Sequence, residues 1–218
     1  MNMKEIQKAL GITADGIRGP VTTGAILHAA DQGRVEILPK PVYTAPPGGV
    51  VSAAPVTGLK LLVWHWTVGT HTANDTDKEH YHFIVNGDGK VIAGDMKPED
   101  NISIADDRYA AHTKGANTGA IGVAFAGMLG AQERPFDSGD YPLLDEQIEA
   151  GMRLSAQLCK LYGIPVGRRT TLTHAEVQPT LGVQQNGKWD ITWLPGMQAP
   201  KPPIEVGDIL RSKLFRYM

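Results

Sequence analysis

The sequence predicts an α/β fold, and three observations lead to this prediction. Residues 61–67 (LLVWHWT) form a short apolar run bounded by turn-forming residues, which is typical of a buried strand. Two β-rich runs flank the segment 86–89 (NGDG), which is a strong signal for a hairpin. Residues 142–162 repeat apolar side chains at helical spacing and are followed by Gly163. Buried strands, a hairpin and one long amphipathic helix together indicate a sheet packed against helices.

The composition is that of an ordinary globular protein. Of 218 residues, 42% are hydrophobic and 20% are charged, and the net charge of −2 calls for neither nucleic acid nor an anionic membrane as a partner. The single cysteine, Cys159, excludes an internal disulfide framework and a zinc site built from cysteines. Neither a signal-peptide core nor a run of transmembrane length is visible. We therefore expect a chain that is made in the cytoplasm, without a signal peptide and without membrane insertion.

The sequence of the first 57 residues predicts a small helical unit followed by a linker. Residues 1–37 combine two short helical patterns with a turn-rich segment at 13–20. The string IQKALGITADGIRGPVTTGAI resembles the small peptidoglycan-binding helical domain that is attached to many cell-wall hydrolases, although the third helix of that domain is missing. The alternative is a helical pair that packs on the main domain. Residues 38–57 are rich in proline and glycine and predict the linker.

The next stretch of the main domain contains several histidines. A polar loop is predicted for residues 69–79, ahead of a strand over 80–85 that forms the first half of the hairpin. Period two places Tyr81 and His82 on opposite faces of this strand. The His-x-His pair at 80 and 82 could chelate a metal, but we interpret His82 as a buried structural histidine.

The remaining elements follow in order along the chain. An irregular connection over 94–119 leads to a second buried strand at 120–127. After the helix at 142–162, in which Cys159 is interpreted as a packing residue, a short strand at 169–173 leads into His174. We expect the tail, residues 201–218, to dock onto the core.

His65, His174 and Asp190 are the candidate metal ligands. Each histidine lies at or after a predicted strand, and Asp190 follows the second histidine by sixteen residues. Two imidazoles and one carboxylate suit Zn²⁺ and leave a fourth position for water. The spacing alone is a weak signal, because the three residues lie far apart in the sequence and form no HExxH or CxxC motif. Within its apolar run, His65 is more typical of a core histidine that bonds a backbone carbonyl.

Four sequence blocks, in order, strengthen the zinc interpretation. These blocks are VWHWT, YHFIVNGDGKVIAG, AAHTKGANTGAIGVAFAG, and His174 followed by GKWD. Together they resemble the zinc-dependent N-acetylmuramoyl-L-alanine amidases of type 2, a family that includes phage endolysins and the animal peptidoglycan recognition proteins. The resemblance implies a mixed central β-sheet flanked by helices, here over a domain at 58–200 that precedes the tail.

The resemblance also implies roles for individual residues. His65, His174 and Asp190 match the three Zn²⁺ ligands of the family. Lys188 matches the lysine that stabilises the developing oxyanion, and an extended GKWD segment would place it on the same face as Asp190. Tyr81 matches the tyrosine that orients or polarises the attacking water; the alternative is a tyrosine of the hairpin core.

Four further residues are candidates for contact with substrate. His112 and Asn117 match positions that line the muropeptide groove, and the alternative for both is stabilisation of their own loop. Trp66 and Thr67 follow His65 directly and are candidates for lining the same groove, although Trp66 suits the core equally well.

The implied function is hydrolysis of the amide between N-acetylmuramic acid and L-alanine in bacterial peptidoglycan. The expected partner is therefore peptidoglycan, both its glycan and its stem peptide. A chain without a signal peptide fits a phage or prophage endolysin that a holin-type membrane partner releases to the cell wall. The alternatives are a non-catalytic peptidoglycan-binding protein, a cytoplasmic amidase that recycles muropeptides, and a zinc peptidase that cuts within the stem peptide.

Overall fold

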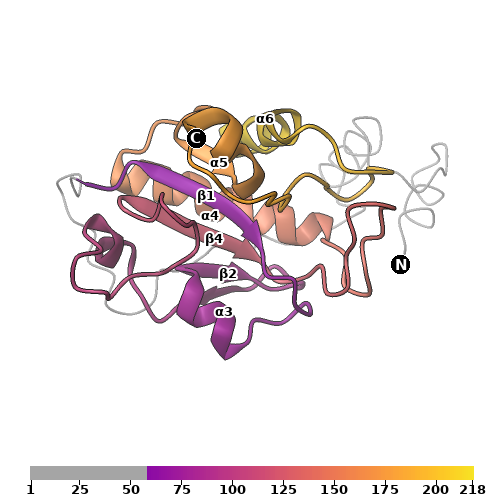
Figure 1. Ribbon diagram of the computed structural model, residues 1–218, viewed down its shortest axis with the longest axis horizontal. Coiled ribbons are helices and arrows are strands. Elements are labelled where there is room, and N and C mark those ends of the chain that lie inside the picture. The colour runs from indigo at the N-terminus through magenta and orange to yellow at the C-terminus, as the bar shows by residue number, and fades with distance from the viewer. Residues whose placement is uncertain (1–57) are drawn as a thin grey trace, which may run out of the picture. The chain divides into compact units, whose positions relative to one another are not determined.

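The computed structural model describes residues 58–218 of the chain (Figure 1). The predicted helical unit at 1–37 and the linker at 38–57 lie outside the described residues. The predictions about wall binding by that unit are therefore carried by the sequence alone.

A five-stranded mixed sheet forms the centre of the described domain, in the order β3-β2-β4-β1-β5 (Figure 1). Strands β4, β1 and β5 are parallel to one another, β2 is parallel to β4, and β3 completes the hairpin antiparallel to β2. The predicted α/β class with a mixed sheet and flanking helices is thus confirmed. The strand bounds are β1 Leu61–Trp66, β2 Phe83–Val85, β3 Val91–Ala93, β4 Ala120–Phe125 and β5 Thr171–Thr173.

Helices pack against this sheet and along its edge at β5 (Figure 1). The helix bounds are α3 Asp75–His80, η1 Pro98–Ile102, α4 Asp145–Tyr162, α5 His174–Leu181, α6 Pro203–Leu214 and η2 Phe215–Tyr217. The predicted docking of the tail is confirmed, since α6 contacts α4, α5 and β5 and buries Val206, Leu210 and Leu214. Among these described helices, none has the length and apolar character needed to cross a bilayer.

The prediction of a loop at 69–79 followed by a strand from His80 is wrong. Residues 75–80 form the short helix α3, which Asn74 caps through a reciprocal capping box with Asp77. His80 is therefore the last residue of a helix, and Tyr81 is its C-cap. The helix is almost entirely polar, so it lacks the apolar periodicity on which the strand-and-loop prediction depended.

Two other helical predictions differ from the structure. The long helix begins at Asp145, three residues after the predicted start, because Leu144 is still extended and serves as the N-cap. No helix was predicted after residue 173, yet α5 begins directly at His174. Both differences concern helix starts, where local capping decides the boundary.

The two longest strands, β1 and β4, are buried on both faces. The alternation of side chains along β1 decides on which face of the sheet His65 lies. Trp64 donates a hydrogen bond from Nε1 to Ser155 Oγ on α4 at 2.9 Å. Because successive side chains of a strand alternate in direction, Trp64 faces α4 and His65 faces the opposite side of the sheet. The His65 side chain is completely buried there.

Candidate metal centre

Pairing of β1 with β5 brings the two histidines together. Trp64 is the register partner of Thr173, so the next residue on each chain, His65 and His174, lies at the same level of the sheet. His65 is still within β1, whereas His174 opens α5. Asp190 approaches from the segment after α5, where its carbonyl accepts a hydrogen bond from Ala175 N at 3.3 Å.

Three donor atoms of these residues form a compact triangle. His65 Nδ1 lies 3.0 Å from His174 Nδ1 and 3.2 Å from Asp190 Oδ2, and His174 Nδ1 lies 2.8 Å from Asp190 Oδ2. Tetrahedral zinc with ligand bonds of about 2.0–2.1 Å requires donor atoms roughly 3.3 Å apart, so the triangle has nearly the size that the ion needs. Within residues 58–218, this is the one His, Cys, Asp or Glu cluster that could hold a metal.

Burial and hydrogen bonding together keep His65 and Asp190 in the protonation states that bind metal. Burial lowers the pKa of His65 from 6.5 to about 4, although the hydrogen bond with Asp190 opposes the shift. For Asp190, burial disfavours the ionised form, but hydrogen bonds with His174 and His65 outweigh it and hold its pKa below the ordinary value. A neutral imidazole beside an ionised carboxylate is the form in which both coordinate a metal ion.

Each histidine also meets a partner on the side away from the donor triangle. His174 Nε2 lies 2.8 Å from Gln185 Oε1, an oxygen that can only accept, so this bond leaves the Nδ1 lone pair free for metal. His65 Nε2 lies 3.2 Å from His112 Nδ1 and 3.4 Å from Thr113 Oγ1. Outer partners of this kind fix the tautomer and the ring orientation of metal-binding histidines.

His112 lies behind His65, in the interior. Its pKa is lowered well below 6.5, first by burial and then by the neighbouring histidines. Gly122 of β4 makes room for it, since a Cβ at that position would lie 2.6 Å from the imidazole Cγ. Asn117 is buried too, and its Oδ1 accepts a hydrogen bond from Thr113 N at 2.7 Å. Contact of His112 or Asn117 with muropeptide stays a prediction.

Tyr81 borders the centre from the end of α3. Its ring centroid is 5.2 Å from that of His65, and the side chain is half-buried. Burial, then the negative charges of Asp190 and Asp77, raise its pKa well above 10, so the phenol keeps its proton. A protonated hydroxyl near His65 is able to donate a hydrogen bond to a ligand at the donor triangle.

Lys188 lies on the exposed side of the centre. The side chain is exposed, and its positive charge is one of the causes that lower the pKa of His65, which places the ammonium within electrostatic reach. Trp66 points to the other face of β1, where its ring packs edge-on against Trp189 with centroids 4.7 Å apart. Thr67 Oγ1 accepts hydrogen bonds from Gly69 N and Gly127 N.

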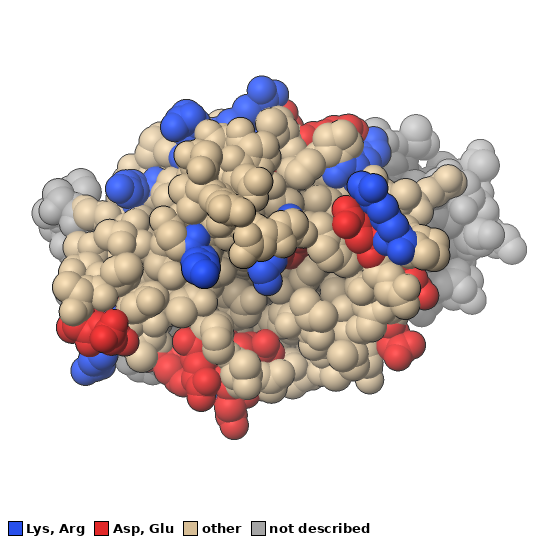
Figure 2. Space-filling model, in the orientation of Figure 1, with Lys and Arg blue, Asp and Glu red and all other residues tan. Residues whose placement is uncertain are grey.

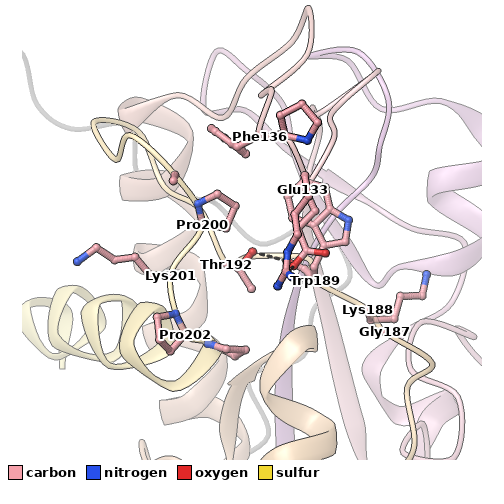
Figure 3. Close-up of a pocket in the computed structure, with 13 residues that line it drawn as sticks. Glu133, Phe136, Gly187, Lys188, Trp189, Thr192, Pro200, Lys201 and Pro202 are labelled. Atoms are coloured by element: carbon pink, nitrogen blue, oxygen red, sulfur yellow. Dashed lines mark hydrogen bonds and ion pairs between the residues drawn. The ribbon is translucent and has the colours of Figure 1, made fainter.

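Lys188 and Trp189 form part of the wall of a hollow of about 720 Å³ (Figure 3). Figure 3 shows Lys188 on one side of it and Lys201 on the other, with Thr192 and Trp189 between them. On the face that Figure 2 shows, acidic side chains gather over α3, whereas Lys and Arg lie mainly toward α5 and α6. The hollow is lined by residues 133–136, 187–189, 192 and 199–203.

The residue after Asp190 holds a strained backbone. Ile191 is completely buried and has a φ of 59°, which a β-branched side chain rarely adopts. Such strain persists only where surrounding packing enforces it, and it clusters at functional sites. Here it sets the direction in which the Asp190 segment leaves the centre.

Two features of the centre were missed at the sequence level. Gln185 lies in a polar segment with no periodic or motif signal, so its bond to His174 emerges only in three dimensions. The start of α5 did have a signal, because Thr173 and Glu176 are spaced as a capping box and the structure shows both of its hydrogen bonds.

The family model Amidase_2, described as N-acetylmuramoyl-L-alanine amidase, matches residues 54–196. No curated protein matches the chain.

Solved structures with a similar fold share little sequence with this chain. The amidase LysC from Clostridium intestinale URNW is 20% identical, with 70% of this chain and 85% of that chain covered and a TM-score of 0.41. The hydrolase AmiA of Staphylococcus aureus, solved with its ligand, is 15% identical, with coverages of 72% and 73% and a TM-score of 0.46. The peptidoglycan recognition protein SD of Drosophila is 24% identical, with coverages of 59% and 76% and a TM-score of 0.38. At these identities and scores, the likenesses assign no role to any residue.

Proposed function

Because the chain belongs to the N-acetylmuramoyl-L-alanine amidase family, we propose that it hydrolyses the amide between the lactyl group of N-acetylmuramic acid and L-alanine in bacterial peptidoglycan. The observation that carries the proposal is the triangle of buried donors from His65, His174 and Asp190. A recognition protein that only binds peptidoglycan has no need of three ligands preorganised for a catalytic ion.

Zinc is the cofactor that this donor set fits, and His65, His174 and Asp190 would hold it. When bound, zinc acts as a Lewis acid that makes water nucleophilic near neutral pH and polarises a carbonyl. Three protein donors leave a fourth coordination position of a tetrahedral ion for water or substrate, as in catalytic zinc sites. Because Asp190 supplies the third donor, the centre does not depend on a reduced thiol.

Lys188 and Tyr81 would act on the reacting atoms. The Lys188 ammonium is a donor that can move toward the carbonyl oxygen as negative charge develops there. The Tyr81 hydroxyl, which keeps its proton, would orient the attacking water or the scissile carbonyl by hydrogen bonding. The hollow beside Lys188 offers space for one arm of the substrate, and Trp189, which packs against the buried Trp66, forms an apolar part of its wall.

The test uses the full chain and isolated cell walls. The protein is treated with a chelator, and wall clearing is followed before and after zinc is restored, with the products analysed for free N-terminal L-alanine. We expect that zinc restores the activity, that His65→Ala abolishes it, and that the control His80→Ala, an exposed histidine of α3, retains it. A His65→Ala variant that cleared walls at the wild-type rate would overturn the assignment, and new termini within the stem peptide would indicate a peptidase.

The narrower biological role that we propose is host lysis by a phage or prophage endolysin. In this role the enzyme is made in the cytoplasm and reaches the wall when a holin-type partner opens the membrane. Its support is the sequence resemblance, including the N-terminal unit, and the competing role is recycling of free muropeptides. Cleavage of intact walls supports the lytic role, whereas cleavage of soluble muropeptides with intact walls untouched supports recycling.

A further inference from the structure

The helix α6 contributes one buried side chain to the element that carries a metal ligand. Arg211 is only 4% exposed, and its guanidinium donates to Glu176 Oε1 at 2.8 Å and to Glu176 Oε2 at 3.1 Å. Glu176 is completely buried in the first turn of α5, two residues after His174. A guanidinium fork on a carboxylate fixes both the distance and the relative plane of the two groups.

Glu176 in turn fixes the start of α5. Its Oε2 accepts a hydrogen bond from Thr173 N at 2.8 Å, and Thr173 Oγ1 accepts one from Glu176 N at 3.2 Å. His174 is the first residue of the helix and lies between the two halves of this capping box. The position of the Glu176 carboxylate therefore determines where the backbone of His174 lies.

Arg211 also holds the strand that leads into His174. Its NH1 donates to Thr171 O of β5 at 2.7 Å, so one guanidinium connects the elements on both sides of the ligand. Gly207, one turn earlier on α6, permits this approach, because a Cβ at that position would overlap the Glu176 carboxylate. The close packing of α6 on α5 thus depends on both Gly207 and Arg211.

We propose that Arg211 is a positioning residue for the metal centre, which acts through Glu176 and Thr171 to fix the orientation of the His174 imidazole. The proposal rests on the zinc centre of the proposed function, and it deepens that function by extending the centre to α6. Buried ion pairs are poor sources of net stability. A bidentate pair such as Arg211 with Glu176 does fix the relative geometry of its two groups. The effect of removing this pair should therefore appear in zinc affinity beyond any change in stability.

The experiment compares three variants of the full chain. The double variant Arg211→Met with Glu176→Gln removes both buried charges, while the glutamine oxygen still accepts from Thr173 N. Arg211→Lys keeps the charge but loses the fork. Met152→Ala is the matched control, because Met152 is completely buried on α4, across the sheet from His65. The measurements are Zn²⁺ affinity by competition with a chromophoric chelator, the visible spectrum of the Co²⁺-substituted protein, and thermal unfolding without metal.

We expect the double variant to fold and to bind Zn²⁺ about 10- to 100-fold more weakly, as is typical for loss of an outer-shell support. Its Co²⁺ spectrum should change, and Arg211→Lys should fall between it and the wild type. Met152→Ala should unfold at a lower temperature yet keep its Zn²⁺ affinity within about twofold, because distant sites act independently.

Two outcomes would overturn the positioning role. One is a folded double variant that binds Zn²⁺ as tightly as the wild type, and the other is an equal loss of affinity in Met152→Ala. Because cleavage of substrate is not measured, the two proposals can fail separately. Wild-type protein that binds zinc but cuts no muramoyl amide would refute the amidase function alone.

Discussion

Gln185 Oε1 lies 2.8 Å from His174 Nε2, on the side of the imidazole that faces away from the donor triangle. The amide of Gln185 is itself fixed, because its Nε2 donates to Lys114 O at 2.9 Å. Its backbone N donates to Gln178 Oε1 at 2.9 Å, which connects the segment back to α5. With the amide held in this way, the tautomer of His174 that offers Nδ1 to metal is the one that the surroundings favour.

Replacement of Gln185 tests this relationship. We expect Gln185→Leu, which keeps the approximate size but removes the acceptor, to weaken Zn²⁺ binding by about 10- to 100-fold. Gln185→Glu keeps an acceptor at the same place and should bind more tightly than the leucine variant. The measurement is chelator competition, with the neighbouring exposed Gln184→Leu as control. Equal affinity in the leucine variant and the wild type would contradict the assigned tautomer.

Zinc should stabilise the fold as well as supply the chemistry. At a zinc concentration 100-fold above the Kd, the free energy of unfolding should rise by about 2.7 kcal/mol. For a chain of this size, that corresponds to an increase in Tm of roughly 5–10 °C. Thermal unfolding with and without zinc measures this shift in Tm. His65→Ala should lose the shift and His80→Ala should keep it; a full shift in His65→Ala would place the metal elsewhere.

The stability of the metal-free protein should fall between pH 6.5 and 4. Burial lowers the pKa of His65 and of His82 from 6.5 to about 4, so in this window the unfolded chain binds more protons than the folded one. The contribution is present in full above pH 6.5 and is lost as the pH falls toward 4. Each histidine accounts for roughly 3 kcal/mol at most.

Denaturant unfolding at a series of pH values measures this dependence. His82 is a better residue to replace than His65, because its hydrogen-bond partners are Asn101 Oδ1 and Gly122 N. Its replacement therefore leaves the donor triangle intact. His82→Gln should reduce the slope by about one third, since His65 and His112, whose pKa values burial also lowers, still titrate. A free energy of unfolding that stays constant from pH 7 to 4.5 would show that these histidines are not held neutral.

Lys188 should affect the rate of cleavage and leave metal binding intact. We expect Lys188→Ala to reduce kcat by on the order of a hundredfold or more, the typical cost of losing one oxyanion donor. The Zn²⁺ affinity should not fall, because Lys188 donates to no ligand residue in the described part of the chain and its positive charge lies within electrostatic reach of His65. Lys201→Ala, across the same hollow and paired with Glu205, is the matched control. Similar kcat values for both variants would remove Lys188 from the reaction.

The sequence was sufficient for the elements whose signals are local. The strands β1 and β4 are short apolar runs, the hairpin has its Asn-Gly-Asp-Gly turn, and α4 has an apolar face that begins with Ile148 and ends with Tyr162. The three candidate ligands were found because the strand ends and the resemblance pointed to the same residues. His82 was correctly interpreted as buried.

The rest depends on contacts that a single sequence does not reveal. The helix α3 is polar and α5 spans only eight residues, so neither shows a helical apolar period, and only their capping residues mark them. Arg211 and Glu176 are 35 positions apart, and each looks like an ordinary surface charge until α6 packs against α5. A single sequence does not show whether a charged residue is buried or exposed.

The strand order has a consequence for the synthesis of this protein. The donors lie at positions 65, 174 and 190, and the supporting guanidinium lies at 211. Because β1 lies between β4 and β5, it can pair on both sides only after both strands are made, about 60 and 110 positions later in the chain. A nascent chain that stops before residue 190 therefore has no complete donor set. A chain that stops before residue 211 lacks the guanidinium that pairs with Glu176. Translation must therefore pass residue 190 before the three donors can meet, and residue 211 before Arg211 can pair with Glu176.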